Sequence, residues 1–333
     1  MKTTERVLAL LKKNKHKIVS GECIAKKLNI SRTSVWKAVQ ILKKDGYVIK
    51  AKQNAGYVLE KLVDVLDTEH IITDLSEEAK GYTGTKIEIF KELDSTNNEA
   101  KKRLSISSNS KKCNGIVLIA DKQTNGRGRL GRTFYSPSHN GMYMSLIVTV
   151  DQFVFDTTII TALAAVAVCR VLQTYNLKPK IKWVNDIFIH DKKVCGILTE
   201  GSINLETGLI DTIILGIGLN VFSTKMFSKE LQKIAGAVFE SKKDIQISRN
   251  KIIAKTINEL YAVICNPTLI SLRMQEYRNL SFIISKNVIV SSGSQTYEAR
   301  VIDITPEAHL LIKTQNGDIK EIVSGEVSLT PIR

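Results

Sequence analysis

The sequence has few cysteines and no long apolar run. Its five cysteines are odd in number, lie far apart and include no Cys-x-x-Cys pair, which argues against a disulfide framework or a zinc site and favours a reducing compartment. The longest apolar stretch, residues 159–169, is too short to cross a bilayer. The first residues also lack the apolar core of a signal peptide. We therefore expect a cytoplasmic protein with no membrane partner.

Acidic residues are scarce relative to basic ones. The 333 residues carry a net charge of +15, and residues 1–64 alone hold 15 Lys and Arg against 5 Asp and Glu. Such a concentrated positive field favours a polyanionic partner for this segment. The length suggests two or three domains. We expect three domains, at 1–64, 65–277 and 278–333, of which the first would bind DNA.

The first segment has the element order of a winged helix-turn-helix. Apolar spacing predicts a helix around residues 7–11, a short helix after Ser20 and a third helix at 32–44, followed by strands at 47–52 and 56–59. The third helix would enter a DNA groove and the hairpin would be the wing. A basic three-helix interaction domain is the alternative. The candidate DNA-binding residues are Ser31, Arg32, Thr33, Ser34, Lys37, Lys52 and Asn54.

One aromatic residue of the third helix has an ambiguous role. Trp36 lies next to the apolar stripe formed by Val35, Val39 and Leu42. We expect Trp36 to pack against the core of this domain rather than to contact bases.

The other two segments differ in their patterns. The second alternates strand-like runs, such as 87–90, 115–120 and 194–200, with helices at 97–104, 157–175, 227–239 and 248–264, which predicts a mixed α/β domain with one main sheet. The third has only short, closely spaced strands, typical of a small SH3-like β-barrel. The expected fold class is therefore multidomain α+β.

Glycine and arginine alternate in residues 126–132, Gly-Arg-Gly-Arg-Leu-Gly-Arg. Glycine lets the backbone approach a ligand closely, and arginine offers a planar set of donors for phosphate. The stretch lacks the GxxxxGK[ST] of a Walker loop, and its GxGxxG follows a polar turn instead of opening a helix. It predicts a mobile loop that closes on an anion, with a basic RNA-binding or disordered loop as the alternative.

Residues 180–198 predict a hairpin with its turn at 190–192. Its mouth carries a carboxamide, a carboxylate and two ammonium groups, which could bind a charged small molecule. Turn chemistry with solvated lysines is the alternative. The residues concerned are Lys182, Asn185, Asp186 and Lys193.

Together these motifs resemble the biotin protein ligase family. The resemblance rests on GRGRLGR, the following FYSP, then KWVNDI and KKVCGIL at their observed separations, and it extends over essentially the whole chain. The winged helix and C-terminal barrel are similar to the repressor-type members. The sequence departs from the family pattern at Val184, where proline is common, and at Phe134, where tryptophan is common.

The resemblance implies roles for individual residues. The implied catalytic residues are Arg129, Lys193, Lys182 and Asp186, with Asp186 also a candidate Mg²⁺ ligand. The implied biotin-binding residues are Ser95, Thr96, Asn97, Gln123, Arg127, Gly128, Arg129, Lys193, Gly196 and Gly216. The implied adenylate and ATP loop residues are Gly126, Gly131, Arg132, Phe134, Asn185 and Asn220. Residues 96–99 also have the pattern of a capping box.

The function implied is a biotin protein ligase that is also a repressor. ATP and biotin would be substrates and Mg²⁺ the cofactor. The partners would be the biotin carboxyl carrier protein domain of acetyl-CoA carboxylase, operator DNA and, with adenylate bound, a second copy of the chain. The alternatives are a non-catalytic ligand-sensing repressor, a lipoate ligase, and a nucleic-acid-binding protein without enzymatic activity.

Overall fold

The structure is a computed structural model that describes most of the chain. The described residues are 3–14, 17–44, 47–52, 55–61, 64–84, 86–107, 109–149, 157–203, 210–239, 247–292 and 295–329. The chain divides into two compact units, Met1–Val65 and Leu66–Arg333. Of the predicted DNA-binding residues, Asn54 lies outside the described residues.

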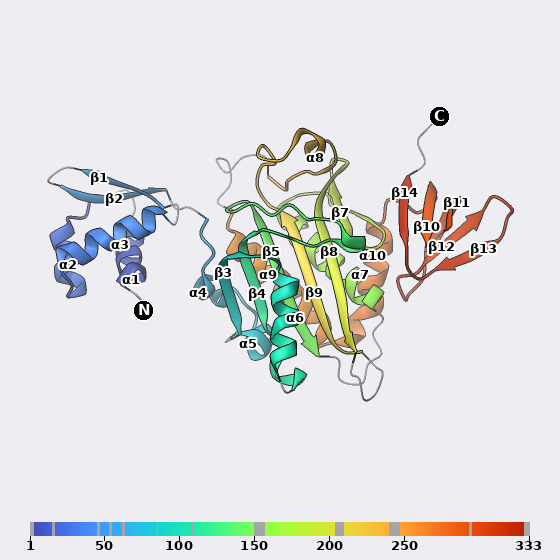
Figure 1. The fold of residues 1–333 in the computed structure, drawn as a ribbon, viewed down its shortest axis with the longest axis horizontal. Helices are drawn as coiled ribbons and strands as arrows, with labels where there is room; N and C mark the ends of the chain where they lie inside the picture. Colours follow the sequence, from blue (N-terminus) through green and yellow to red (C-terminus); the bar gives the residue numbers. More distant parts are fainter. Residues whose placement is uncertain are drawn as a thin grey trace. The chain divides into compact units, whose positions relative to one another are not determined.

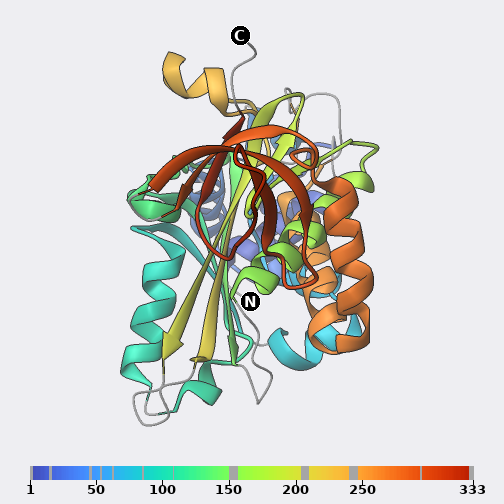
Figure 2. The ribbon, with the colours of Figure 1, turned by 90° about the vertical axis from the view of Figure 1, so that its right-hand side faces the viewer.

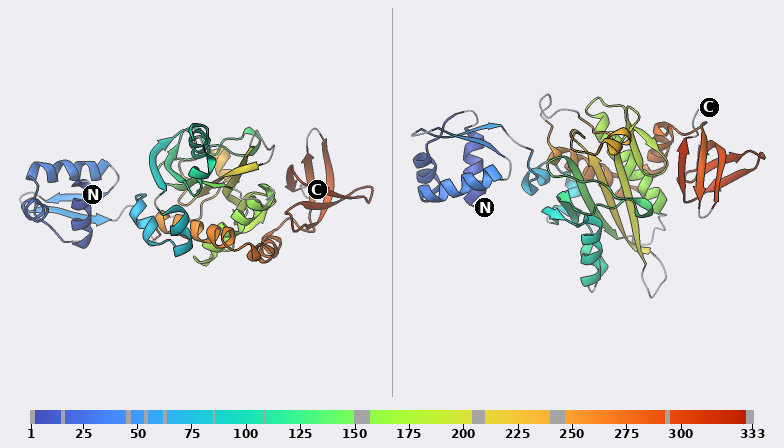
Figure 3. Two further views of the ribbon diagram at one scale, coloured as in Figure 1. Left: turned by 90° about the horizontal axis from the view of Figure 1, so that it is seen from below. Right: turned by 45° about the horizontal axis from the view of Figure 1, so that its top comes forward.

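The first unit is the predicted three-helix bundle with a hairpin (Figure 3). Ser20 caps the second helix by accepting a hydrogen bond from the backbone N–H of Cys23 at 3.0 Å, and Asn29 ends this helix in the left-handed conformation. The apolar faces of all three helices and the hairpin share one core that includes Val7, Val35 and Leu59. The elements are α1 (Thr3–Lys13), α2 (Gly21–Leu28), α3 (Arg32–Lys44), β1 (Val48–Lys52) and β2 (Gly56–Lys61).

A seven-stranded mixed sheet organises the second unit (Figure 1). The strand order is β3-β4-β5-β9-β8-β7-β6, in which β3 and β4 are parallel and the other neighbours antiparallel. The expectation of one main mixed sheet is confirmed. The strands are β3 (Ile87–Leu93), β4 (Val117–Gln123), β5 (Gly141–Thr149), β6 (Lys180–Lys182), β7 (Asp186–Ile189), β8 (Lys192–Ile203) and β9 (Ile210–Asn220).

Helices cover both faces of this sheet (Figure 2). The side chains of β4 alternate between the two faces: Val117 and Ile119 join the large core, whereas Leu118 packs with Ala100 of α6 on the opposite side. The large core also receives α7 and α9. The helices are α4 (Thr68–Thr73), α5 (Glu77–Thr83), α6 (Thr96–Ile106), α7 (Thr157–Gln173), α8 (Lys229–Ile234), α9 (Arg249–Ile264) and α10 (Ile270–Leu280).

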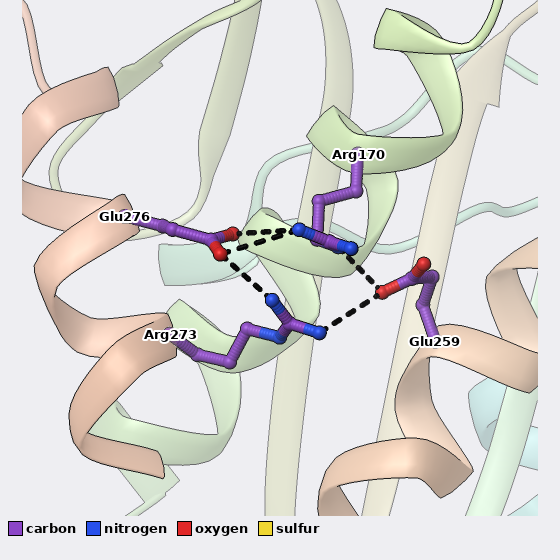
Figure 4. Close-up of polar contacts among 4 residues, drawn as sticks. All are labelled: Arg170, Glu259, Arg273 and Glu276. Atoms are coloured by element: carbon purple, nitrogen blue, oxygen red, sulfur yellow. Dashed lines mark hydrogen bonds and ion pairs between the residues drawn. The ribbon is translucent and has the colours of Figure 1, made fainter. Parts of the chain in front are cut away.

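Four helices differ from the sequence prediction. The helix expected at 227–239 is only the six-residue α8, capped by Ser228. Helices α4, α5 and α10 were not predicted. Helix α10 is tied to α7 and α9 by a ring of alternating charges, in which Glu276 pairs with both Arg170 and Arg273, and Glu259 lies opposite (Figure 4).

The C-terminal part is an antiparallel sheet with the order β13-β12-β11-β10-β14. Its antiparallel strands match the expectation of a small barrel, but closure does not occur, because the edge strands β13 and β14 are not paired within the described residues. The indole N–H of Trp183 donates to the carbonyl of Ala308 at 2.7 Å and so joins this sheet to the central domain. The strands are β10 (Asn287–Ser292), β11 (Gln295–Ile304), β12 (Leu310–Thr314), β13 (Ile319–Ile322) and β14 (Glu326–Leu329).

Among the helices described, none combines the length and the apolar character needed to cross a membrane.

Candidate active site and DNA-binding surface

The predicted site residues of the second unit converge on a cavity of about 460 Å³. Its walls come from β4, β8, β9, the 126–132 loop, α8 and β14. Gly126 and Gly131 belong to the loop but do not line the cavity. The predicted residues that line it are Ser95, Thr96, Asn97, Gln123, Arg127, Gly128, Arg129, Arg132, Phe134, Lys182, Asn185, Asp186, Lys193, Gly196, Gly216 and Asn220.

The glycine- and arginine-rich loop folds back on itself. The backbone N–H of Gly128 donates to the carbonyl of Arg132 at 2.7 Å, and that of Phe134 donates to the carbonyl of Gly126 at 2.8 Å. Gly131 has a φ of 73°, a conformation that suits glycine. Only a short 3₁₀ turn, Arg129–Gly131, forms here. The expectation that this GxGxxG does not open an α-helix is therefore confirmed.

Two arginines of the loop contact the C-terminal sheet. The guanidinium of Arg129 donates to the side-chain oxygen of Asn185 at 3.3 Å and to the carbonyl of Gly325 at 3.1 Å. Arg132 forms a two-armed ion pair with Glu326. Gly325 and Glu326 also line the cavity, and sequence reasoning missed both. No local pattern marks them, because their contacts join residues almost 200 positions apart.

The predicted hairpin is confirmed as β7 and β8. His190 and Asp191 both have positive φ, which is the backbone of a tight two-residue turn. The ammonium of Lys193 lies 2.6 Å from Oδ1 of Asp186, and Asn185 donates from its amide to the carbonyl of Ile197 at 3.0 Å. The hairpin thereby holds a lysine, a carboxylate and an amide in fixed positions on the cavity wall.

Lys182 lies in a strongly cationic part of the cavity. Burial is the main cause that lowers its pKa, and the charges of Lys193 and Arg132 act in the same direction, whereas Asp186 and Glu326 oppose the shift. Positive charges that repel one another in a partly buried site are stabilised by an anion. This end of the cavity is therefore suited to a phosphate-bearing ligand.

Other side chains that line the cavity are uncharged and form hydrogen bonds. The backbone N–H of Thr96 donates to the side-chain oxygen of Gln123 at 2.9 Å, and Gln123 donates to the hydroxyl of Ser136 at 2.8 Å. The capping-box prediction is wrong: Ser95 is the N-cap residue and its hydroxyl does not cap α6, while Glu99 accepts from Arg103. The hydroxyl of Ser95 thus stands at the cavity without a capping role.

In the first unit, the predicted DNA-binding residues gather at the start of α3 and at the end of β1. Arg32, Thr33 and Lys37 are exposed, Ser34 is half-buried, and Lys52 is exposed in the hairpin. Ser31 caps α3 by accepting from the backbone N–H of Ser34 at 3.0 Å.

The packing role expected for Trp36 is wrong. Its side chain is 53% exposed, whereas Val35 and Val39 beside it are fully buried. The helix turns Trp36 away from the apolar stripe, because residue 36 lies about 100° around the helix from residue 35. The solvent-facing side of α3 therefore combines basic, small polar and aromatic groups.

Comparison with known proteins accounts for all three parts of the chain. Residues 3–58 match an HTH domain, residues 89–220 match the Biotin/lipoate A/B protein ligase family, and residues 283–330 match the Biotin protein ligase C terminal domain. The fold and the cavity therefore define a class of proteins in which a helix-turn-helix domain is joined to a ligase domain.

Two relatives and one solved structure extend this likeness. The Bifunctional ligase/repressor BirA of Bacillus spizizenii is 32% identical over 325 residues, covering 93% of this chain and 94% of that protein, and its Bacillus subtilis counterpart is 30% identical over 99% and 100%. The biotin protein ligase from Aquifex aeolicus in complex with biotin and ATP superimposes with a TM-score of 0.60 at 27% identity, over 74% of this chain and 99% of that one. The chain belongs to the biotin protein ligase family.

Proposed function

We propose that this protein activates biotin with ATP to form biotinyl-5′-AMP and then transfers the biotinyl group to a lysine. The acceptor is the biotin carboxyl carrier protein domain of acetyl-CoA carboxylase. The observation that carries the proposal is the convergence of uncharged hydrogen-bonding side chains and cationic side chains in one cavity of about 460 Å³. Biotin is neutral at its ureido ring and anionic at its carboxylate, which has to meet a phosphate. The two kinds of side chain match these two parts of biotin.

In the first step, a carboxylate oxygen of biotin attacks the α-phosphorus of ATP, and pyrophosphate leaves. Two anions must approach each other, so catalysis depends on positioning and on neutralising charge. Arg127, Arg129, Lys182 and Lys193 line the cavity and supply that charge. No nucleophilic side chain is required.

Asp186 is the proposed ligand of Mg²⁺. Mg²⁺ is commonly held by one or two carboxylates together with substrate phosphates. No group of three acidic, His or Cys side chains that could hold a metal alone occurs in the described part of the chain. Oδ1 of Asp186 is buried, and the ammonium of Lys193 is its one partner among the described residues, at 2.6 Å. Such a site fits a metal held mainly by ATP, where it would neutralise phosphate charge.

In the second step, the lysine amine of the acceptor attacks the biotinyl carbonyl carbon, and AMP leaves. The mixed anhydride must be kept from water until then. We assign this role to the 126–132 loop and to Arg129 in particular. Arg129→Gly removes the contacts to Asn185 and Gly325 and should release adenylate while the protein stays folded. Adenylate trapped in solution by free lysine would reveal the leak, and normal retention would refute this role of Arg129.

The direct test of the enzyme is biotin transfer. The purified chain, ATP, Mg²⁺, biotin and a carrier-domain substrate should give a carrier heavier by one biotinyl group in intact-protein mass spectrometry. A carrier whose acceptor lysine is replaced by arginine should stay unmodified. Biotin bound without any transfer would favour the non-catalytic ligand-sensing repressor, and transfer of lipoate instead of biotin would favour a lipoate ligase.

We also propose that the protein represses transcription in response to biotin. The observation that favours it is the basic first unit with its exposed α3. Formation of the adenylate would promote dimerisation, so that two copies of α3 face the half-sites of a palindromic operator. In this proposal residues 65–277 and 278–333 act as separate domains, and the protein works in the cytoplasm. Biotin plus ATP should increase affinity for a duplex selected by the chain from random DNA; an unchanged affinity would remove the repressor function.

A further inference from the structure

A three-residue turn, 183–185, joins β6 to β7 at the wall of the cavity. Asn185 of the turn lines the cavity, and so do Lys182 and Asp186, which flank the turn on its two sides. Val184 at the middle of the turn does not line the cavity and is only 5% exposed. The conformation of this buried turn therefore decides where several cavity-lining side chains point.

Each residue of the turn is held by a different part of the second unit. The side chain and the backbone of Asn185 are hydrogen-bonded to β8, and the indole of Trp183 is hydrogen-bonded to the turn that precedes β12. The carbonyl of Val184 accepts a hydrogen bond from the hydroxyl of Tyr277 on α10 at 3.0 Å. The middle of the turn is thus tied to a helix that lies outside the cavity.

Tyr277 presents its hydroxyl from a fixed position. It is fully buried, and burial is the main cause that raises its pKa well above the ordinary value, so the hydroxyl keeps its hydrogen. Arg273 lies one helical turn earlier on the same face of α10, and Glu276 directly precedes Tyr277. Both belong to the ring of charges that ties this helix to α7 and α9, so the ring also fixes the helix from which the hydroxyl reaches the turn (Figure 4).

The carbonyl that Tyr277 holds belongs to the peptide unit that leads into Asn185. A buried carbonyl that loses its donor costs free energy, and rotation of the peptide unit toward another donor would relieve that cost. Such a rotation changes ψ of Val184 and φ of Asn185 and therefore redirects the side chain of Asn185. In the structure, the amide oxygen of that side chain accepts from the guanidinium of Arg129 at 3.3 Å.

We propose that Tyr277 is a positioning residue whose hydroxyl holds the peptide unit before Asn185 and so keeps that side chain directed at Arg129. Tyr277 does not line the cavity, so it acts through the turn and not on a substrate. The inference rests on the proposed adenylation of biotin. It adds to that function a residue of α10, the helix that no local sequence pattern predicted.

The test is the biotin-dependent exchange of labelled pyrophosphate into ATP by variants of the full chain. Tyr277→Phe keeps the buried ring and removes only the donor. It should lower kcat/KM for ATP by about tenfold or more, because small displacements of positioning groups have effects of at least this size. The KM for biotin should change far less, because Arg129 keeps its hydrogen bond to the carbonyl of Gly325.

A second measurement tests the route through Asn185. In an Asn185→Ala background the side chain that the turn directs is already missing. Tyr277→Phe should then cause little further loss of kcat/KM for ATP, since two changes on one route are not additive.

Tyr261→Phe is the matched control. It is the same substitution at another buried tyrosine, on α9, whose side chain is 1% exposed. Its hydroxyl makes no hydrogen bond within the described part of the chain, so no positioned group depends on it. Tyr261→Phe should exchange pyrophosphate as the unaltered chain does.

Three outcomes overturn the proposal. Tyr277→Phe could use ATP as well as Tyr261→Phe does, or its effect could be as large in the Asn185→Ala background as in the unaltered chain. It could also lose the use of ATP and of biotin equally, as a variant with a general loss of structure would. If the unaltered chain showed no biotin-dependent exchange, the proposed function itself would fall. Normal exchange by the unaltered chain together with any of the three outcomes would remove only this inference.

Discussion

Gly216 on β9 faces the side chain of Asn97, and this contact allows a quantitative prediction. A Cβ at position 216 would lie 2.2 Å from Oδ1 and 2.9 Å from Cγ of Asn97. Atoms of this kind normally stay about 3.5 Å apart, so Asn97 would have to move by roughly 1 Å. It cannot do so and keep its contacts with Glu200 and Ser145. Overpacking of this kind costs about 1–3 kcal/mol.

Gly216→Ala should therefore weaken biotin binding by about 5- to 150-fold if the strain falls on Asn97. The assay is calorimetric titration of the full chain with biotin, with urea unfolding measured on the same sample. Gly81→Ala in α5 is the control, because a Cβ there meets nothing within 4 Å. Biotin affinity equal to that of the unaltered chain in folded Gly216→Ala would refute the reasoning that ties this glycine to the site.

Three further predictions concern burial, pH and DNA. Arg249→Met should lower the free energy of unfolding in urea by about 1–3 kcal/mol, because the fully buried Arg249 donates to Asp121 at 2.8 Å and to the carbonyl of Gly141 at 3.1 Å, and both acceptors would lose this partner. An unchanged free energy of unfolding would contradict this. Because its pKa is lowered, Lys182 loses its positive charge at a lower pH than an ordinary lysine does. ATP affinity should therefore fall as the pH rises through that range, and Lys182→Arg should retain the affinity. Identical pH profiles for the two proteins would argue against Lys182 as an ATP ligand. Of the two tryptophans, Trp36 is 53% exposed and Trp183 is 3% exposed. Sheared duplex DNA at low salt should therefore quench the fluorescence of Trp36. Quenching that persists in Trp36→Phe would exclude this contact.

Local patterns were sufficient to predict the elements whose buried side chains are mainly apolar. The helices of the first unit, the β7–β8 hairpin and α9 follow from spacing and turn residues. Helix α10 was missed because its buried face includes Arg273 beside Met274 and Tyr277. The partners that neutralise Arg273, Glu276 within the helix and Glu259 on α9, are arranged only by the fold (Figure 4).

The candidate site was predictable where a motif is continuous. The loop at 126–132 and the 182–198 motifs do line one cavity, as their chemistry suggested. The position of Glu326 at the cavity was not predictable, because Glu326 lies on β14, and the pairing of β14 with β10 determines where that strand lies.

The most direct test of the central claim is exchange of labelled pyrophosphate into ATP by the purified chain with Mg²⁺. Exchange requires the reversible formation of an adenylate and does not require an acceptor protein. The account predicts exchange that depends on biotin and does not occur with lipoate. Absence of exchange in a protein shown to be folded and to bind biotin would contradict it.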